Sequence, residues 1–130
     1  MIILDTSILI DYIRQNNKGR KTLFDKVIQL EGSFSLGISA VTVQELYQGK
    51  STRIRDKEEE MLDVLGLLRI YVYDESVAAT AGKIVRDWSP NMGFADAAIA
   101  ATAINEECSL FTLNTRDFSN VPSLKFYYLR

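Results

Sequence analysis

Five short apolar segments, separated by stretches with a helical pattern, constrain the fold of this chain more than any other feature. Apolar residues follow one another directly in most of these segments, as they do in strands that are buried on both faces of a sheet. Strands that alternate with helices predict an α/β domain with a central parallel sheet and helices on both faces. The expected strands are residues 2–4, 35–38, 69–72, 110–112 and 126–128, and the expected helices are residues 8–14, 21–30, 42–50, 57–68, 77–88 and 96–107.

The composition restricts the chemistry that the chain can perform. Its 130 residues predict one domain over residues 1–130. With no histidine and one cysteine, it cannot form a Ser-His-Asp triad, a Cys-His pair, or a zinc site made of histidine or several cysteines. Acid–base catalysis would therefore use carboxylates, lysine, tyrosine or a metal-bound water. The net charge of −2 argues against a strongly basic nucleic-acid binder, but a carboxylate site regains attraction for phosphate through its metal ion.

The sequence also indicates a location for the protein. Asp5 interrupts the N-terminal apolar run and no basic residue precedes it, so this end does not resemble a signal peptide. No stretch reaches the roughly 18 uncharged apolar residues of a membrane span. The single Cys108 cannot form an internal disulfide, and we expect it to be buried as a small apolar residue. We therefore expect a cytoplasmic protein with no membrane partner.

Acidic and amide side chains follow the expected strands or open the expected helices. Asp5 comes directly after the first strand, and Asn114 and Asp117 follow the fourth. Glu45 and Asp96 lie in the first turns of two helices. Because ligands of parallel α/β sheets bind beyond the carboxyl ends of the strands, we expect these side chains to lie along one edge of the sheet.

Each of these residues also has a purely local interpretation. Asp5 suits a helix cap, and Asp96 suits the first turn of a helix, where the dipole favours an acid. Thr42-x-x-Glu45 matches a capping box, in which Glu45 bonds back to the amide of Thr42. Asn and Asp are common turn residues. Taken together, however, several carboxylates in one cleft repel one another unless a cation neutralises them, and carboxylates prefer hard cations such as Mg²⁺ or Mn²⁺.

Four motifs, taken as a set, resemble those of the PIN-domain nucleases, and most strongly the VapC toxins of prokaryotic toxin–antitoxin pairs. The motifs are Leu4-Asp5-Thr6-Ser7, residues 41–49, residues 96–103 and residues 112–118, in that order. They extend from residue 4 to residue 118, so the resemblance covers nearly the whole chain. No single motif would be specific, but the ordered set is.

The resemblance implies a three-layer α/β/α domain with a parallel sheet of four or five strands and a Mg²⁺- or Mn²⁺-dependent ribonuclease site. Asp5, Glu45 and Asp96 match the three acids of the family by position. Asn114 stands where the family has an Asp or Asn, and Asp117 follows three residues later. The expected catalytic residues are Asp5, Glu45, Asp96, Asn114 and Asp117, the expected metal ligands are Asp5, Glu45, Asp96 and Asp117, and the supporting hydroxyls are Thr6, Ser7 and Thr112.

An RNA substrate would also need basic contacts. We expect Arg14, Lys18, Arg20 and Lys21 to contact phosphates, although solvated helix faces would explain them equally. A second basic cluster within residues 50–57 runs directly into acidic residues, which could instead make a charge-paired helix. The resemblance further implies a cognate antitoxin protein, whose tail lies across a helical groove near the site, and a homodimer.

Two other interpretations remain open. An aspartyl phosphotransferase would also carry an aspartate after its first strand, but such enzymes have a second acid two residues later, where this chain has Ser7. A non-catalytic RNA- or protein-binding module with the same fold is the other alternative. Such modules usually lose one of the carboxylates, whereas this chain retains Asp5, Glu45 and Asp96.

Overall fold

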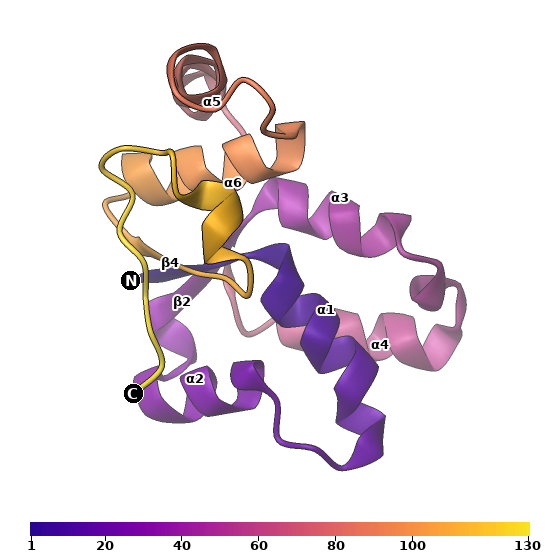
Figure 1. The fold of residues 1–130 in the computed structure, drawn as a ribbon. Coiled ribbons are helices and arrows are strands. Elements are labelled where there is room, and N and C mark those ends of the chain that lie inside the picture. The colour runs from indigo at the N-terminus through magenta and orange to yellow at the C-terminus, as the bar shows by residue number, and fades with distance from the viewer.

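A parallel sheet forms the centre of the molecule (Figure 1). The computed structural model describes residues 1–130, apart from the side chain of Asn17. In this described part of the chain, the sheet has four strands in the order β3-β2-β1-β4, and every neighbouring pair is parallel. The strands are β1 (Ile2–Leu4), β2 (Leu36–Ser39), β3 (Arg69–Tyr71) and β4 (Ser109–Phe111).

The expected fifth strand at residues 126–128 is reduced to a single parallel bridge between Leu110 and Phe126. Two backbone hydrogen bonds hold this segment, from Leu110 N to Lys125 O and from Tyr127 N to Leu110 O, each 2.8 Å long. Both bonds use the central residue of β4, which is only three residues long. Pairing at this one residue places the C-terminal segment beside the sheet without making it a strand.

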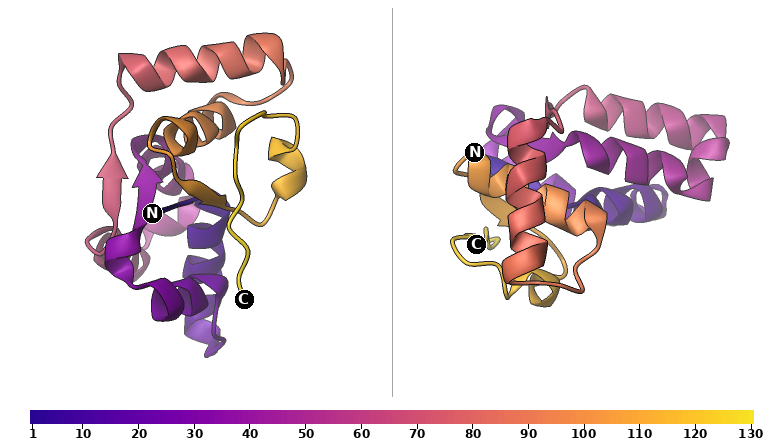
Figure 2. Two further views of the ribbon diagram at one scale, coloured as in Figure 1. Left: turned by 90° about the vertical axis from the view of Figure 1, so that its left-hand side faces the viewer. Right: turned by 90° about the horizontal axis from the view of Figure 1, so that it is seen from above.

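Helices cover both faces of the sheet, which confirms the expected three-layer arrangement (Figure 2). One layer contains α1, α2 and α4, and the other contains α5 and α6, while α3 contacts both α1 and α6. The helices are α1 (Thr6–Gln15), α2 (Leu23–Glu31), α3 (Ala40–Gln48), α4 (Arg55–Leu65), α5 (Glu75–Asp87) and α6 (Phe94–Asn105), and the short 3-10 turns are η1 (Asn16–Lys18), η2 (Ser33–Ser35), η3 (Lys50–Arg53) and η4 (Thr115–Phe118).

The first strand divides its side chains between two cores. Ile2 and Leu4 belong to the core beneath α1, α2 and α4, whereas Ile3 belongs to the core beneath α5 and α6. This division follows from the alternation of side chains across a strand. Both sets are buried, which explains why the strand is apolar at every position. Cys108 is buried in the second core, as expected.

The alanine-rich helix α6 lies between the sheet and α5 (Figures 1 and 2). Every residue from Ala97 to Ala103 is buried, so the helix has no solvent-facing side over this stretch. The small alanine side chains allow close approach between helix and sheet. This packing carries the N-terminal turn of α6, and with it Asp96, to the edge of the sheet.

Close packing also explains Gly37 in the middle of β2. A Cβ atom at this position would lie 2.7 Å from Cε2 of Tyr71, which is well inside van der Waals contact. The absence of a side chain therefore lets the Tyr71 ring lie across the neighbouring strand. Arg69 in turn stacks its guanidinium over this ring, 4.7 Å from the centroid.

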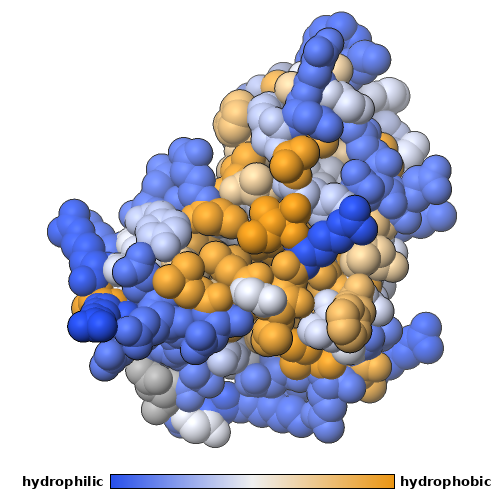
Figure 3. Space-filling view, turned by 180° about the vertical axis from the view of Figure 1, so that it is seen from behind, coloured by the Kyte–Doolittle hydropathy of each residue, from blue (hydrophilic) through white to orange (hydrophobic). Residues whose placement is uncertain are grey.

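Strand β3 forms one edge of the sheet and leaves apolar side chains exposed. Ile70 is 43% exposed and Val72, just beyond the strand, is 68% exposed. Figure 3 shows apolar residues gathered on the face opposite to that seen in Figure 1. Among the described residues, no helix is both long enough and apolar enough to cross a membrane.

Candidate active site

The polar site lies where the strand order reverses. The chain passes from β1 to β2 and β3 on one side, and then returns to place β4 on the other side of β1. In open α/β sheets this reversal leaves a crevice at the carboxyl ends of the strands on either side of it, which here are β1 and β4. At this reversal, the amide of Asp5, just beyond β1, donates a 2.9 Å hydrogen bond to Phe111 O at the end of β4.

Asp5 is held at this crevice by two hydroxyl groups. Ser7 Oγ and Thr112 Oγ1 each donate a 2.7 Å hydrogen bond to Asp5 Oδ2. Both hydroxyls also accept main-chain hydrogen bonds from the loop after β4, Ser7 from Leu113 N and Thr112 from Asn114 N. Asp5 occupies the position of the α1 cap, but its side chain makes no capping bond. Its Oδ1 atom, which no described donor contacts, is therefore available to an external ligand.

Glu45 is positioned by a chain of threonines and not by a capping box. Helix α3 begins at Ala40 with Ser39 as its cap, so Glu45 lies in the second turn and the predicted Thr42 capping box is wrong. Thr6 Oγ1 donates to Glu45 Oε1 at 2.6 Å and lies 2.9 Å from Thr42 Oγ1. Because the single proton of Thr6 goes to Glu45, Thr42 donates to Thr6.

Thr42 is the site residue that sequence reasoning missed. Its side chain is fully buried, and it fixes the hydroxyl that orients Glu45. The i,i+3 spacing between Thr42 and Glu45 carried the signal, since residues at this spacing share one face of a helix. The same spacing also fits a capping box, which is why the pattern alone could not distinguish the two roles.

Asp96 is the electrostatic centre of the site. Burial, together with the smaller effects of the charges on Asp5, Glu45 and Asp117, raises the pKa of Asp96 from 3.8 to about 6. Three carboxylates that are distant in sequence therefore lie close enough to Asp96 for their charges to act on it across this crevice. The arrangement confines negative charge where a cation would be stabilised.

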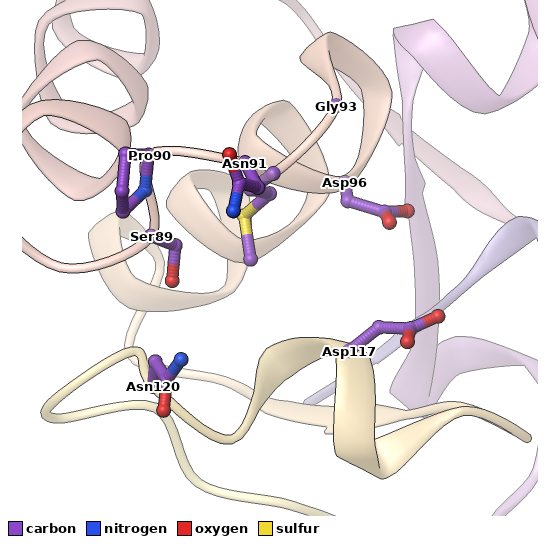
Figure 4. A pocket seen from close by; sticks show the side chains of 8 residues that line it. Ser89, Pro90, Asn91, Gly93, Asp96, Asp117 and Asn120 are labelled. Carbon is purple, nitrogen blue, oxygen red and sulfur yellow. The ribbon is translucent and has the colours of Figure 1, made fainter.

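Asp117 and Asn114 have different relations to Asp96. Asp117, in η4, lines the same cavity as Asp96, and Figure 4 shows the two carboxylates pointing to the same side. Asn114 precedes η4 and lines a neighbouring shallow depression together with Asp117. Both are exposed. The structure thus places Asp117, and not Asn114, beside the third acid.

The donor chemistry fits a hard divalent cation. The crevice offers carboxylate and hydroxyl oxygens from Asp5, Glu45, Asp96 and Asp117 and their neighbours, whereas Cys108 is buried in the core. Among the described residues, no three acidic or cysteine side chains are placed as one compact ligand group. Mg²⁺ does not require such a group, because it commonly keeps several waters and binds one or two carboxylates.

The predicted RNA-contact residues fall into separate places. Arg20 and Lys21 line a cavity of about 310 Å³, together with Lys26 and with Leu113 of the loop after β4. Arg14 lines a different cavity between α1 and α3. Lys18 is exposed in η1 and lines neither cavity.

The second basic cluster is largely charge-paired. Arg55 bonds Glu59 at 3.2 Å, and Lys57 lies 3.4 Å from Glu60 while also donating to Ile13 O. The alternative interpretation of this segment as a charge-paired helix is therefore confirmed for these two residues.

Comparison with known proteins agrees with the motifs and the geometry. The family model described as "PIN domain" matches residues 2–124. Ribonuclease VapC10 of Mycobacterium tuberculosis is 30% identical over 128 residues, which cover 96% of this chain and 91% of that protein. Ribonuclease VapC1 of Methanocaldococcus jannaschii is 31% identical over 132 residues, with 97% of this chain and 86% of that protein covered.

Solved structures show the same fold. A DNA-bound VapBC complex from Salmonella typhimurium superposes with a TM-score of 0.81 at 23% identity, over 97% of this chain and 96% of the other. FitAcB from Neisseria gonorrhoeae superposes with a TM-score of 0.71 at 26% identity, over 98% and 97% of the two chains. The family match over residues 2–124, together with relatives of at least 30% identity along the whole chain, shows that this protein belongs to the PIN-domain family.

Proposed function

We propose that this protein is a divalent-metal-dependent endoribonuclease and the toxin of a type II toxin–antitoxin pair. The observation that carries the proposal is the convergence of Asp5, Glu45 and Asp117 on Asp96 at the switch point of the sheet, where their charges raise the pKa of Asp96. The similarity to two proteins named VapC ribonucleases supports RNA as the substrate. The retention of all three family acids favours this activity over a non-catalytic binding module.

The proposed metal is Mg²⁺ or Mn²⁺, held by Asp5 Oδ1 and the Asp96 carboxylate. When bound, such an ion supplies a water of lowered pKa and offsets the charge that develops on the phosphate. Ser7 and Thr112 occupy Oδ2 of Asp5 and so leave Oδ1 as its coordinating atom. The hydroxyls thereby fix the orientation of the carboxylate before any ligand arrives.

Glu45 and Asp117 complete the proposed site through water. Glu45 has one oxygen bonded to Thr6, which leaves the other free to orient a nucleophilic water. Asp117 is exposed on η4 and can hold a second hydrated ion or the water beside the leaving oxygen. Asn114, one turn earlier, would contact the same water or the substrate.

RNA would approach over the cavity that Arg20, Lys21 and Lys26 line. This cavity reaches Leu113, and the amide of Leu113 bonds the hydroxyl of Ser7 that holds Asp5. Leu113 and Ser7 thus connect the basic cavity to Asp5. Phosphates bound there would lead the backbone towards the crevice.

An inhibitory segment of the antitoxin would lie in the groove between α1 and α3. This groove of about 280 Å³ is lined by Ile10, Ile13 and Leu46 and also by Glu45 of the site. A helix or strand with apolar side chains can fill such a groove. Because Glu45 lines it, the same segment would block access to the metal.

Dimerisation would use the apolar surface at the edge of β3, which we call the β3-edge patch. It consists of Ile70, Val72, Tyr73 and Phe94, all exposed, with the last two rings 5.4 Å apart. Exposed apolar groups that gather in one place commonly mark an interface. Phe94 opens α6 two residues before Asp96, so a second copy bound here would lie beside the site.

The decisive test of the proposed function is cleavage of single-stranded RNA by the purified chain with Mg²⁺, with Mn²⁺ and with EDTA. We expect cleavage with either metal, none with EDTA, and none by the Asp5→Asn protein. Asp63→Asn is a matched control, because Asp63 is exposed on α4 and lines neither the cavity of Asp96 nor that of Arg20 and Lys21. If Mg²⁺ gives no heat in calorimetry and no RNA is cut, the protein is a binding module.

A further inference from the structure

A cavity of about 250 Å³ is lined in part by Asp96 and Asp117 (Figure 4). Asp96 and Asp117 form one wall of this cavity, which we call the α5–α6 cavity. The opposite wall comes from the loop between α5 and α6 and from the turn after η4. This opposite wall includes Ser89, Asn91, Met92 and Asn120.

The opposite wall is polar but carries no charge. In Figure 4 the hydroxyl of Ser89 and the amide of Asn120 lie across the cavity from one another, with Asn91 above them. Asn91 and Asn120 are exposed, whereas Ser89 is buried at the base of the loop before α6. Their hydroxyl and amide groups offer both donors and acceptors to an occupant. Met92 adds a polarizable apolar surface that can contact a flat ring.

The charges on the two walls determine what can enter. A phosphate would face the carboxylates of Asp96 and Asp117 with no cation opposite, so it is repelled. Phosphates have a better site in the cavity lined by Arg20 and Lys21. A neutral group with hydrogen-bonding edges and an apolar face suits the α5–α6 cavity, and a nucleobase has these properties.

We propose that the α5–α6 cavity holds one base of the RNA beside the cleaved phosphate, and that Asn91 and Asn120 select that base. The inference rests on the proposed ribonuclease function. Asp96 belongs to both the cavity and the catalytic crevice, so a base that fills the cavity is adjacent to the bond that is cut. Asparagine amides read the edges of bases through paired donor and acceptor atoms.

The test is cleavage of a random-sequence single-stranded RNA pool, with the cut ends sequenced. The parent, Asn91→Ala, Asn120→Ala and Gln48→Ala proteins are compared under the same Mg²⁺ concentration. Gln48 is an exposed amide on α3 outside the cavity, so it controls for loss of an amide as such. Both asparagines are exposed, so their removal should leave the melting temperature unchanged.

We expect the parent to prefer one or two bases at a single position next to the cut. Asn91→Ala or Asn120→Ala should reduce that preference roughly tenfold or more at this position alone, as the loss of a base-reading amide does, and Gln48→Ala should not. An unchanged preference in both variants overturns the inference, and so does an equal loss of cleavage on all sequences, which would indicate a role in metal binding. A parent that cuts without base preference overturns the inference alone, whereas a parent that cuts no RNA overturns the proposed function.

Discussion

Thr112 Oγ1 donates a 2.7 Å hydrogen bond to Asp5 Oδ2 and so joins residues that are 107 positions apart in the sequence. The bond links the ends of β1 and β4, the two strands between which the order of the sheet reverses. It is buried, and the acceptor is a carboxylate, which makes it stronger than a neutral hydrogen bond.

Thr112→Val should weaken catalysis while preserving the fold. Valine has nearly the shape of threonine but cannot donate to Asp5, so the carboxylate loses one of its two orienting bonds. Loss of such an orienting partner lowers metal affinity or activity by about 10- to 100-fold. The Mg²⁺ dependence of RNA cleavage measures this effect. Thr112→Ser, which retains the hydroxyl, should behave like the parent, and equal activity in the valine protein would contradict the role.

Asp96→Asn should stabilise the metal-free protein although it abolishes cleavage. The pKa of Asp96 is raised from 3.8 to about 6, so the folded state holds a proton that the unfolded state has released between these values. Stability contributed by this group therefore falls as the pH rises through that interval. Asparagine carries no charge and avoids the loss.

The expected gain from Asp96→Asn is about 1 kcal/mol at pH 7, since a pKa shift of this size sets an upper limit of about 3 kcal/mol and Asp96 is partly exposed to solvent. The gain should vanish below about pH 4. Urea unfolding with EDTA at both pH values measures it. A variant that is less stable than the parent at pH 7 would show that the carboxylates do not repel one another in solution.

Mg²⁺ should raise the melting temperature more at pH 7.5 than at pH 5. At the lower pH Asp96 is mostly protonated, because its pKa is about 6, and a proton must leave before the carboxylate can bind an ion. Differential scanning calorimetry with and without Mg²⁺ at the two pH values checks this. Asp5→Asn should remove the stabilisation at both, and an equal shift at both pH values would exclude Asp96 as a ligand.

Arg20→Ala and Lys21→Ala should each weaken RNA binding and make it less sensitive to salt. Each phosphate contact that is lost lowers the slope of log affinity against log salt by roughly one. Filter binding of a short RNA to the Asp5→Asn protein measures affinity without cleavage. Arg86→Ala is the matched control, because Arg86 pairs with Asp87 on the remote helix α5. If Arg20→Ala and Lys21→Ala leave the slope as unchanged as Arg86→Ala does, the RNA binds elsewhere.

Gly37→Ala should destabilise the sheet by about 1–3 kcal/mol, the usual range for overpacking a core. The added Cβ would lie 2.7 Å from the Tyr71 ring, and a ring held in the core cannot move freely. Urea unfolding of Gly37→Ala, Tyr71→Leu and the double variant forms a thermodynamic cycle. The cost of the alanine should be clearly smaller beside leucine, and additive effects would refute the steric explanation.

Dimerisation through the β3-edge patch can be tested with substitutions of its exposed apolar residues. Val72→Asp combined with Phe94→Asp should yield a monomer in analytical ultracentrifugation, while the parent sediments as a dimer. Phe34→Asp provides the control, because Phe34 is 97% exposed in η2, away from the patch. Equal dimerisation of all three proteins would assign the interface to another surface.

The sequence predicted the sheet and the converging acids because both follow from short-range patterns. Continuous apolar runs mark buried strands, and acids that follow them mark the carboxyl edge. The role of Thr42 could not be predicted in this way. Its bond to Thr6 joins two helices, and only tertiary packing brings those hydroxyls within 2.9 Å.

The start of α3 and the C-terminal segment show the same limit. Ser39 and Thr42 are both favourable caps, and the choice depends on where β2 ends, which pairing with β3 decides. Phe126, Tyr127 and Tyr128 suit a strand by composition, but only Phe126 forms a bridge to β4, and composition does not reveal how far such pairing extends. Asp117 was predicted by position, yet its place beside Asp96 depends on the turn η4.

The seven consecutive buried residues of α6 have a consequence for how such a protein can change. In many enzymes the catalytic groups lie on surface loops, so residues of the core can be substituted without moving those groups. Here the helix that carries Asp96 is itself buried, so an added methyl group along it would displace Asp96, the proposed metal ligand, as well as destabilise the fold. The stability of the fold and the position of Asp96 therefore depend on the same buried helix. A substitution in this stretch is expected to change both.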